Sequence, residues 1–360
     1  SGLYFFNEDG FTRSGPFVFS PFNTPNGLLN DGVTESFGGY GDFEINQETN
    51  SYAAYFNASY DLTDDLTVGG GLRYSKDEKD ANAIFPSFPT RKYVSADFDA
   101  VTWDVNASYQ LSNNMNVYGQ IQKGYQTGGF PPRPFGGPDQ FVSFDETKAI
   151  NYEMGLKGQV HENVSMMLAV FVTDYTDLAL PFSDPTAGGG FVTIVENAGQ
   201  SKAQGIELET TVAITDDFTI RSAVGYLDSE ITEVAEGVQG IGKGDSPALT
   251  PRWTVMVAPS YFMDLESGAT LAFNANYSYR SEMQGQSVYN QSETIDSREL
   301  VGFNISYTNP YGDMEVTLYG ENVLNEVYDV GRLQQSGFVG VMRSNDRSEF
   351  GLKFKKDFEL

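Results

Sequence analysis

The stretch Val101-Thr-Trp-Asp-Val-Asn-Ala-Ser-Tyr-Gln-Leu111 alternates between apolar and polar residues from end to end. Its apolar positions include Trp103 and Tyr109, and its polar positions include Asp104 and Asn106. Because successive side chains of a β-strand point to opposite faces, a period of two sorts these residues onto two faces of a sheet. The stretch is therefore predicted to be a strand with one apolar and one polar face.

The same alternation recurs along the chain, and short polar turns join the segments in pairs. Clusters of Asp, Asn, Ser, Thr and Gly are typical of tight hairpins. Alternating segments are 52–62, 66–75, 150–160, 206–214, 218–226, 269–280, 300–307 and 350–358, while 164–178 and 253–263 are apolar on both faces. The predicted short turns are Thr63–Asp65, Ser112–Asn114, His161–Asn163, Thr215–Asp217, Asp264–Gly268 and Asn309–Asp313.

Longer connections separate the strand pairs. They are predicted at 9–49, 79–98, 127–145, 179–190, 232–248, 282–294 and 329–345, which gives 14 strands in all. Short turns at one end and long loops at the other are typical of an outer-membrane β-barrel, in which the apolar face meets lipid and the polar face lines the interior. The predicted fold is therefore all-β, a transmembrane antiparallel β-barrel.

Aromatic residues occupy both ends of the predicted apolar face. Rings with an apolar body and a polar edge prefer the membrane interface. The predicted interface residues are Tyr60, Tyr109, Tyr261 and Tyr307 beside short turns, and Trp103 and Trp253 toward the long loops. A soluble β-sandwich or β-helix also alternates, but it turns its polar face outward and has no reason to place aromatic rings at both ends of the apolar face.

Composition excludes several classes of function. The 22 Lys and Arg against 49 Asp and Glu leave a net charge of −27, which argues against a nucleic-acid partner. The absence of Cys excludes disulfides, thiolate metal sites and a Cys nucleophile. The one histidine, His161, falls in a short turn, where we expect it to be solvated. We predict no enzyme activity, no cofactor and no metal site.

The long loops are the predicted ligand surface. Loop 127–145 combines aromatic residues and an arginine with prolines, a mixture suited to an amphipathic solute. Candidate ligand-binding residues are Phe130, Arg133, Phe135 and Phe141, with Tyr289 and Arg332 from other loops. The alternative, which the sequence favours, is that the residues of loop 127–145 pack the loops against one another.

Five segments, together spanning most of the chain, resemble motifs of TonB-dependent outer-membrane receptors. Glu146-Thr-Lys-Ala-Ile-Asn-Tyr-Glu-Met-Gly-Leu-Lys157 resembles the family's E-t-x-x-x-Y-E-x-G-x-K strand, and Glu196-Asn-Ala-Gly-Gln-Ser-Lys-Ala-Gln-Gly-Ile-Glu-Leu-Glu209 is similar to N-a-G-x-a-x-x-x-G-x-E-x-E. The other three matches are Lys123–Phe130, Phe171–Leu178 and Gly320–Tyr328.

The resemblance implies a 22-stranded barrel filled by a plug, a known architecture of outer-membrane transporters. This chain would supply the last 14 strands, with residues 1–360 as one barrel domain and the plug and first strands upstream. It departs from the family pattern at its end, where Phe358 is followed by Glu359 and Leu360 instead of ending the chain.

The resemblance also implies a function, namely TonB-dependent active uptake of a scarce solute across the outer membrane of a Gram-negative bacterium. The expected solute is a ferric siderophore, haem, cobalamin or an oligosaccharide. Expected partners are outer-membrane lipid and lipopolysaccharide, the TonB complex acting through the missing plug, and the small solute, and a surface lipoprotein could join them. A complete 14-stranded passive pore and a surface adhesive protein remain the alternatives.

Overall fold

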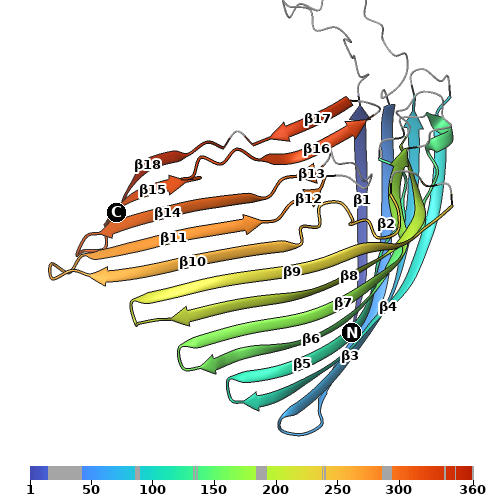
Figure 1. The fold of residues 1–360 in the computed structure, drawn as a ribbon. Coiled ribbons are helices and arrows are strands. Elements are labelled where there is room, and N and C mark those ends of the chain that lie inside the picture. Colours follow the sequence, from blue (N-terminus) through green and yellow to red (C-terminus); the bar gives the residue numbers. More distant parts are fainter. Residues whose placement is uncertain are drawn as a thin grey trace, which may run out of the picture.

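The computed structural model describes residues 1–14, 43–85, 90–132, 134, 137–183, 193–236, 238, 241–285, 294–335, 338–344 and 346–358. Within these, 14 strands form one sheet in which hydrogen-bonded neighbours follow chain order. Every neighbouring pair is antiparallel. Figure 1 shows the sheet as one curved wall, with the tight turns along one end.

The strands of the main sheet differ in length, and the longest lie in the first two-thirds of the chain. They are β1 (Gly2–Ser14), β2 (Phe43–Asp61), β3 (Leu66–Ile84), β4 (Lys92–Ser112), β5 (Met115–Gln126), β6 (Thr147–His161), β7 (Val164–Ser183), β8 (Thr193–Ala213), β9 (Phe218–Val234), β10 (Trp253–Asp264), β11 (Thr270–Arg280), β14 (Arg298–Thr308), β15 (Met314–Glu321) and β18 (Glu349–Lys356). Two small hairpins, β12 (Met283–Gln284) with β13 (Thr294–Ile295) and β16 (Asp329–Gln335) with β17 (Phe338–Arg343), and the short helix η1 (Pro138–Gln140) lie in the connections.

The sequence prediction of 14 sheet strands and six short turns is confirmed. Three of the predicted long connections are too long, because β7 runs to Ser183, β1 continues to Ser14, β2 starts at Phe43 and β3 runs to Ile84. Beyond the aromatic positions these strands carry polar residues such as Glu48 and Asp80 on the face that is apolar lower down. The apolar residues there, such as Ile45 and Ala81, lie on the opposite face, so the alternation changes phase while the backbone hydrogen bonds continue. The two small hairpins escaped prediction because β12 and β13 are too short to show a period, and β16 and β17 do not alternate between apolar and polar residues.

The register of the strands makes one continuous apolar face. Phe56 pairs with Leu72, and Leu72 pairs with Trp103, so the three side chains form a row across β2, β3 and β4. This face is open to the surroundings, with Val105 59% exposed and Phe56 60% exposed. A water-soluble sheet would cover such a face, whereas a lipid-facing sheet leaves it outermost.

Polar side chains line the opposite face and pack onto glycines. A Cβ atom at Gly71 would overlap the side-chain oxygens of Asn57 and Asp104, and one at Gly69 would meet the Asn106 side chain. The absence of side chains at these glycines therefore leaves room for the amides of neighbouring strands to lie over β3.

Buried apolar side chains are few and gather at the long-loop end. The main cluster consists of Phe43, Ile45, Ala81, Ala83, Phe85, Phe130 and Phe141. It joins the ends of β2 and β3 to the connection between β5 and β6, which holds η1. No helix within the described ranges is long and apolar enough to cross a membrane.

Candidate functional site

The inner face of β5 to β8 carries a fixed carboxylate. Glu153 accepts hydrogen bonds from the hydroxyl of Tyr118 at 2.8 Å, the amide of Gln120 at 3.1 Å and the amide of Asn151 at 3.5 Å. Asn151 is itself held, since the Thr173 hydroxyl donates to its oxygen at 2.8 Å. Three donors from two strands keep the Glu153 charge at one position on the wall.

Further carboxylates on β8 share this face. Glu207 and Glu209 form no hydrogen bond or ion pair with another described side chain, and Glu207 lines an open cavity of about 440 Å³ together with Glu153 and Phe171. The cavity offers acceptors and negative charge to whatever occupies the interior. Arg, Lys or amide groups are the chemistry that would complement it.

Segment 127–145, the predicted ligand loop, folds against the sheet. Gly129 and Phe144 exchange backbone hydrogen bonds of 3.1 and 2.9 Å, which closes the segment on itself. The rings of Phe130 and Phe141 lie 5.7 Å apart, and the two residues are only 7% and 0% exposed. In this structure the aromatic side chains pack the segment onto β2 and β3.

A lysine ties the same segment to the polar face of β3. The ammonium of Lys79 donates to the carbonyl oxygen of Gly128 at 2.6 Å and lies 5.7 Å from the centre of the Phe98 ring. Burial lowers the pKa of Lys79, and the charge of Asp77 opposes that shift in part. A small open cavity of about 210 Å³ remains between this segment and the inner face of β1 and β2.

Of the remaining candidate ligand residues, the structure describes Arg332 alone. Arg133, Phe135 and Tyr289 lie outside the described residues. Arg332 lies on β16, where it contacts the Asp329 carboxylate at 2.7 Å and Asp296 at 3.4 Å. A role of these residues in ligand binding stays a prediction.

Asp329 organises the small β16–β17 hairpin. Its side chain is 5% exposed and pairs with Arg332 and, at 2.9 Å, with Arg343 of β17. Burial would raise the pKa of Asp329, but the hydrogen bonds from Arg343 and Arg332 outweigh it and lower the pKa. The carboxylate is therefore charged at neutral pH and bridges the two strands of the hairpin.

The predicted interface aromatic residues all lie on the apolar face. Tyr60 is 70% exposed, Tyr109 45%, Trp253 43% and Tyr261 38%, while Trp103 and Tyr307 are half-buried. Neighbouring strands pair their rings: Trp253 lies 4.8 Å from Tyr226, and Tyr261 lies 6.3 Å from Phe218. Their contact with a membrane interface stays a prediction, but the face and the strand ends on which they lie agree with it.

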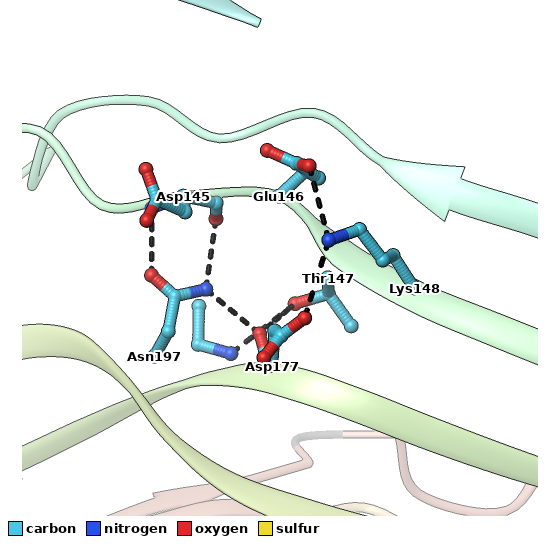
Figure 2. A network of polar contacts seen from close by, with 7 residues as sticks. Asp145, Glu146, Thr147, Lys148, Asp177 and Asn197 are labelled. Atoms are coloured by element: carbon cyan, nitrogen blue, oxygen red, sulfur yellow. Dashed lines mark hydrogen bonds and ion pairs between the residues drawn. The ribbon is translucent and has the colours of Figure 1, made fainter. Parts of the chain in front are cut away.

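A polar network that the sequence analysis missed fastens the ends of β6, β7 and β8 together (Figure 2). Asn197 accepts from the backbone NH of Asp145 at 2.6 Å and donates to the carbonyls of Asp145 at 2.9 Å and Asp177 at 2.7 Å. The Thr147 hydroxyl donates to the same Asp177 carbonyl at 3.1 Å. Lys148 lies between Glu146 at 3.2 Å and Asp177 at 3.3 Å.

This network holds an irregularity in β7. Asp177 has a φ of 54°, in the left-handed region, and the β7–β8 register shifts between Tyr175 and Leu178. A non-glycine residue in that region costs energy, and the bonds to its carbonyl and carboxylate supply compensation. The residues of this network do stand out in the sequence, since Glu146–Lys148 and Asn197 belong to the motifs that resemble the family. Their spacing along the chain, however, does not predict that they contact one another.

In the described parts of the chain, no three His, Cys, Asp or Glu side chains lie close enough together to hold a metal ion. The site is thus a polar wall, bounded at the long-loop end by the packed segment 127–145 and the β16–β17 hairpin.

Comparison with known proteins gives consistent matches. The family model described as TonB dependent receptor-like, beta-barrel, matches residues 2–325. The pesticin receptor of Yersinia enterocolitica is 30% identical over 230 residues, covering 58% of this chain and 33% of that protein. The chain thus spans about a third of the length of the curated relatives it matches.

Solved structures share the fold. The ferric yersiniabactin uptake receptor FyuA from Yersinia pestis matches with a TM-score of 0.74 and 20% identity, over 88% of this chain and 47% of that one. The siderophore receptor PiuA from Acinetobacter baumannii matches with a TM-score of 0.70 and 20% identity, over 88% and 44%.

Proposed function

Because this chain belongs to the family of TonB-dependent receptor β-barrels, we propose that it forms the barrel wall of a receptor that takes up a ferric siderophore by active transport. The chain lies in the outer membrane of a Gram-negative bacterium, as its homologues do. The observation that carries the proposal is the sheet with an exposed apolar outer face and a hydrogen-bonded polar inner face.

The choice of a ferric siderophore draws on the relatives. Two of the matched structures are named for uptake of ferric yersiniabactin and for siderophore reception. The chain's relatives are receptors and transporters, and a receptor requires no catalytic group from the wall. The absence of enzyme activity therefore stays part of the proposal.

The inner carboxylates support a plug as the occupant of the interior. Glu153 is held rigidly by three donors, and Glu207 faces the same cavity without an ion pair to any described residue. A plug that presents basic groups to this wall would be retained at rest and released when the TonB complex pulls on it. Outer-membrane lipid and lipopolysaccharide would contact the aromatic ends of the apolar face, and a surface lipoprotein stays an untested partner.

Uptake by the whole receptor tests the proposal. The full-length protein is produced in a Gram-negative host that lacks its own siderophore receptors, with and without a functional TonB, and uptake of radiolabelled iron is followed with a panel of ferric siderophores. We expect saturable uptake of at least one chelate that disappears without TonB.

Two outcomes would refute active transport. Equal solute entry with and without TonB would indicate a passive pore. Cell adhesion without movement of any solute would indicate an adhesive surface protein. The variant Glu207→Gln tests the role of the inner carboxylate, because it keeps the side chain's size but removes its charge. We expect it to reach the outer membrane in normal amounts while altering the rate of uptake.

A further inference from the structure

Two arginines face each other across neighbouring strands. Arg280 of β11 and Arg298 of β14 are register partners. They lie on the same face as Asn274 and Asn304, whose amides are hydrogen-bonded at 2.9 Å, and therefore on the polar inner face. Like charges directly opposite each other destabilise a sheet, so a pair of this kind needs compensation from elsewhere.

The contacts of Arg280 do not supply a negative charge. Its guanidinium donates to the backbone carbonyl of Asp296 at 2.9 Å and to the thioether sulfur of Met283 at 3.2 Å. Its Nε atom is buried and has no hydrogen-bond partner. A guanidinium has five donors in a fixed plane, and a buried donor without an acceptor carries an energetic cost.

Arg298 is likewise without a carboxylate among the described residues. Its guanidinium lies 4.8 Å from the centre of the Tyr328 ring, whose hydroxyl donates to the Asp346 carboxylate at 3.3 Å. Neither Arg280 nor Arg298 forms an ion pair with any described acidic group, although the chain carries a net charge of −27.

Two carboxylates in this corner are already engaged by other arginines. Asp329 pairs with both Arg332 and Arg343, and the Asp296 carboxylate lies 3.4 Å from Arg332. Asp329 and Arg332 lie on β16, Arg343 lies on β17, and Asp296 directly follows β13. The strands β12, β13 and β16 lie together at the long-loop end of β11 and β14 (Figure 1). Neither the Asp329 nor the Asp296 carboxylate pairs with Arg280 or Arg298, so these two guanidiniums face each other without an ion pair to any described residue.

We propose that Arg280 and Arg298 form a binding site for an anionic group, a carboxylate or a phosphate, on the inner wall at the long-loop end. Guanidiniums bind such groups through paired, charge-assisted hydrogen bonds. A bound anion would accept hydrogen bonds from the terminal NH groups of the two guanidiniums and neutralise the opposed charges. The inference deepens the proposed uptake function, because it names chemistry that the transported solute would carry.

The anion has two conceivable sources, and the test separates them. It belongs either to the solute or to a carboxylate side chain elsewhere in the full-length receptor. The experiment uses full-length receptor purified in detergent, with citrate and inorganic phosphate as probes. Arginines are modified with phenylglyoxal and the rates at individual residues are read by peptide mass mapping. Arg221, an exposed inward arginine of β9 whose register partners are Thr211 and Ala258, is the internal reference.

We expect citrate to slow modification of Arg280 and Arg298 at least several-fold without protecting Arg221. Calorimetry should then show citrate binding weakened about tenfold by Arg280→Gln or Arg298→Gln, but within about twofold of wild type for Arg221→Gln. If both arginines are instead protected without citrate and become reactive in about 1 M salt, where charges are screened within a few ångströms, the anion comes from the receptor itself.

One result would overturn the site. In that result, neither substitution weakens the binding of citrate or phosphate. In addition, the rate at which phenylglyoxal modifies the two arginines changes neither with these anions nor with salt. Because modification and calorimetry do not measure uptake, such a failure would leave the proposed transport function standing, and a failed uptake assay would leave this test interpretable.

Discussion

Replacing Val105 by Arg tests which face of the sheet meets lipid. Val105 lies midway along the apolar face of β4 between Val101 and Tyr109, and it is 59% exposed. Its register partners are Gly70 on β3 and Ile121 on β5. No acidic side chain stands directly across from it on that face, so a guanidinium there would have only hydrocarbon and apolar neighbours in a membrane.

The neighbouring residue provides the matched control. Asn106 points to the opposite, polar face, where its amide donates to the Asp104 carboxylate at 3.0 Å. An arginine at the bilayer midplane on the lipid face costs about 2–4 kcal/mol, whereas a lumen-facing substitution changes stability little. We therefore expect Val105→Arg to lower the free energy of unfolding by about 2–4 kcal/mol and Asn106→Arg to lower it by about 1 kcal/mol or less, because Asp104 gives the new charge a partner.

The assay is urea unfolding of the full-length receptor folded into phospholipid vesicles, followed by tryptophan fluorescence. Val105→Met, similar in length but uncharged, separates the effect of charge from that of size. Equal loss of stability at positions 105 and 106, or a larger loss at 106, would refute the assignment of faces. In a detergent micelle the same assay should give a smaller difference in unfolding free energy between Val105→Arg and Asn106→Arg, because a micelle adapts to a charge more readily than a bilayer.

Three further predictions follow from the packing at the long-loop end. Asn197→Ala removes three hydrogen bonds and should cost about 1–3 kcal/mol locally, seen as faster hydrogen exchange around Asp177; unchanged exchange would contradict the clamp. Phe141→Ala removes a fully buried ring and should cost about 3–5 kcal/mol, seen as faster proteolysis within 127–145, with exposed Val142→Ala as the control. The lowered pKa of Asp329 means that its ion pairs are fully present above about pH 4, the ordinary carboxyl value, and are lost as pH falls through the lowered pKa. Asp329→Asn, which imitates the protonated acid, should therefore loosen the β16–β17 hairpin at neutral pH, measured as faster hydrogen exchange. Unchanged exchange in the hairpin would contradict the role of the Asp329 ion pairs.

The sequence predicts those features that depend on a period and a turn. The alternation in 101–111 and the polar triplet Ser112–Asn114 specify a strand, its two faces and its end, and the structure has β4 stop at Ser112. The extension of β2 to Phe43 was not predictable in this way. In this part of β2 the apolar residues Phe43 and Ile45 lie on the face that is polar lower down, so the pattern of the predicted strand does not continue into it.

The role of segment 127–145 was ambiguous for a chemical reason. Aromatic residues and prolines are suited both to gripping an amphipathic solute and to packing against a sheet. The structure places Phe141 in a fully buried position beside Phe130, and the contact depends on Phe43 and Ile45, which are far away in sequence. Only the path of the chain reveals that neighbourhood.

The arginine pair illustrates what alternation cannot provide. The period of two predicts that Arg280 points inward. On β14, Arg298 lies on the same inward face as Asn304 and Ser306. The period does not predict that Arg280 and Arg298 are opposite, because that depends on register. Register is set by the apolar face, where Phe273 pairs with Ile305, and a slip of one residue would turn every side chain of a strand over. The contacts that hold the outer face in lipid thus also fix which charges meet inside, so a substitution that shifts β11 against β14 should abolish anion binding without touching either arginine.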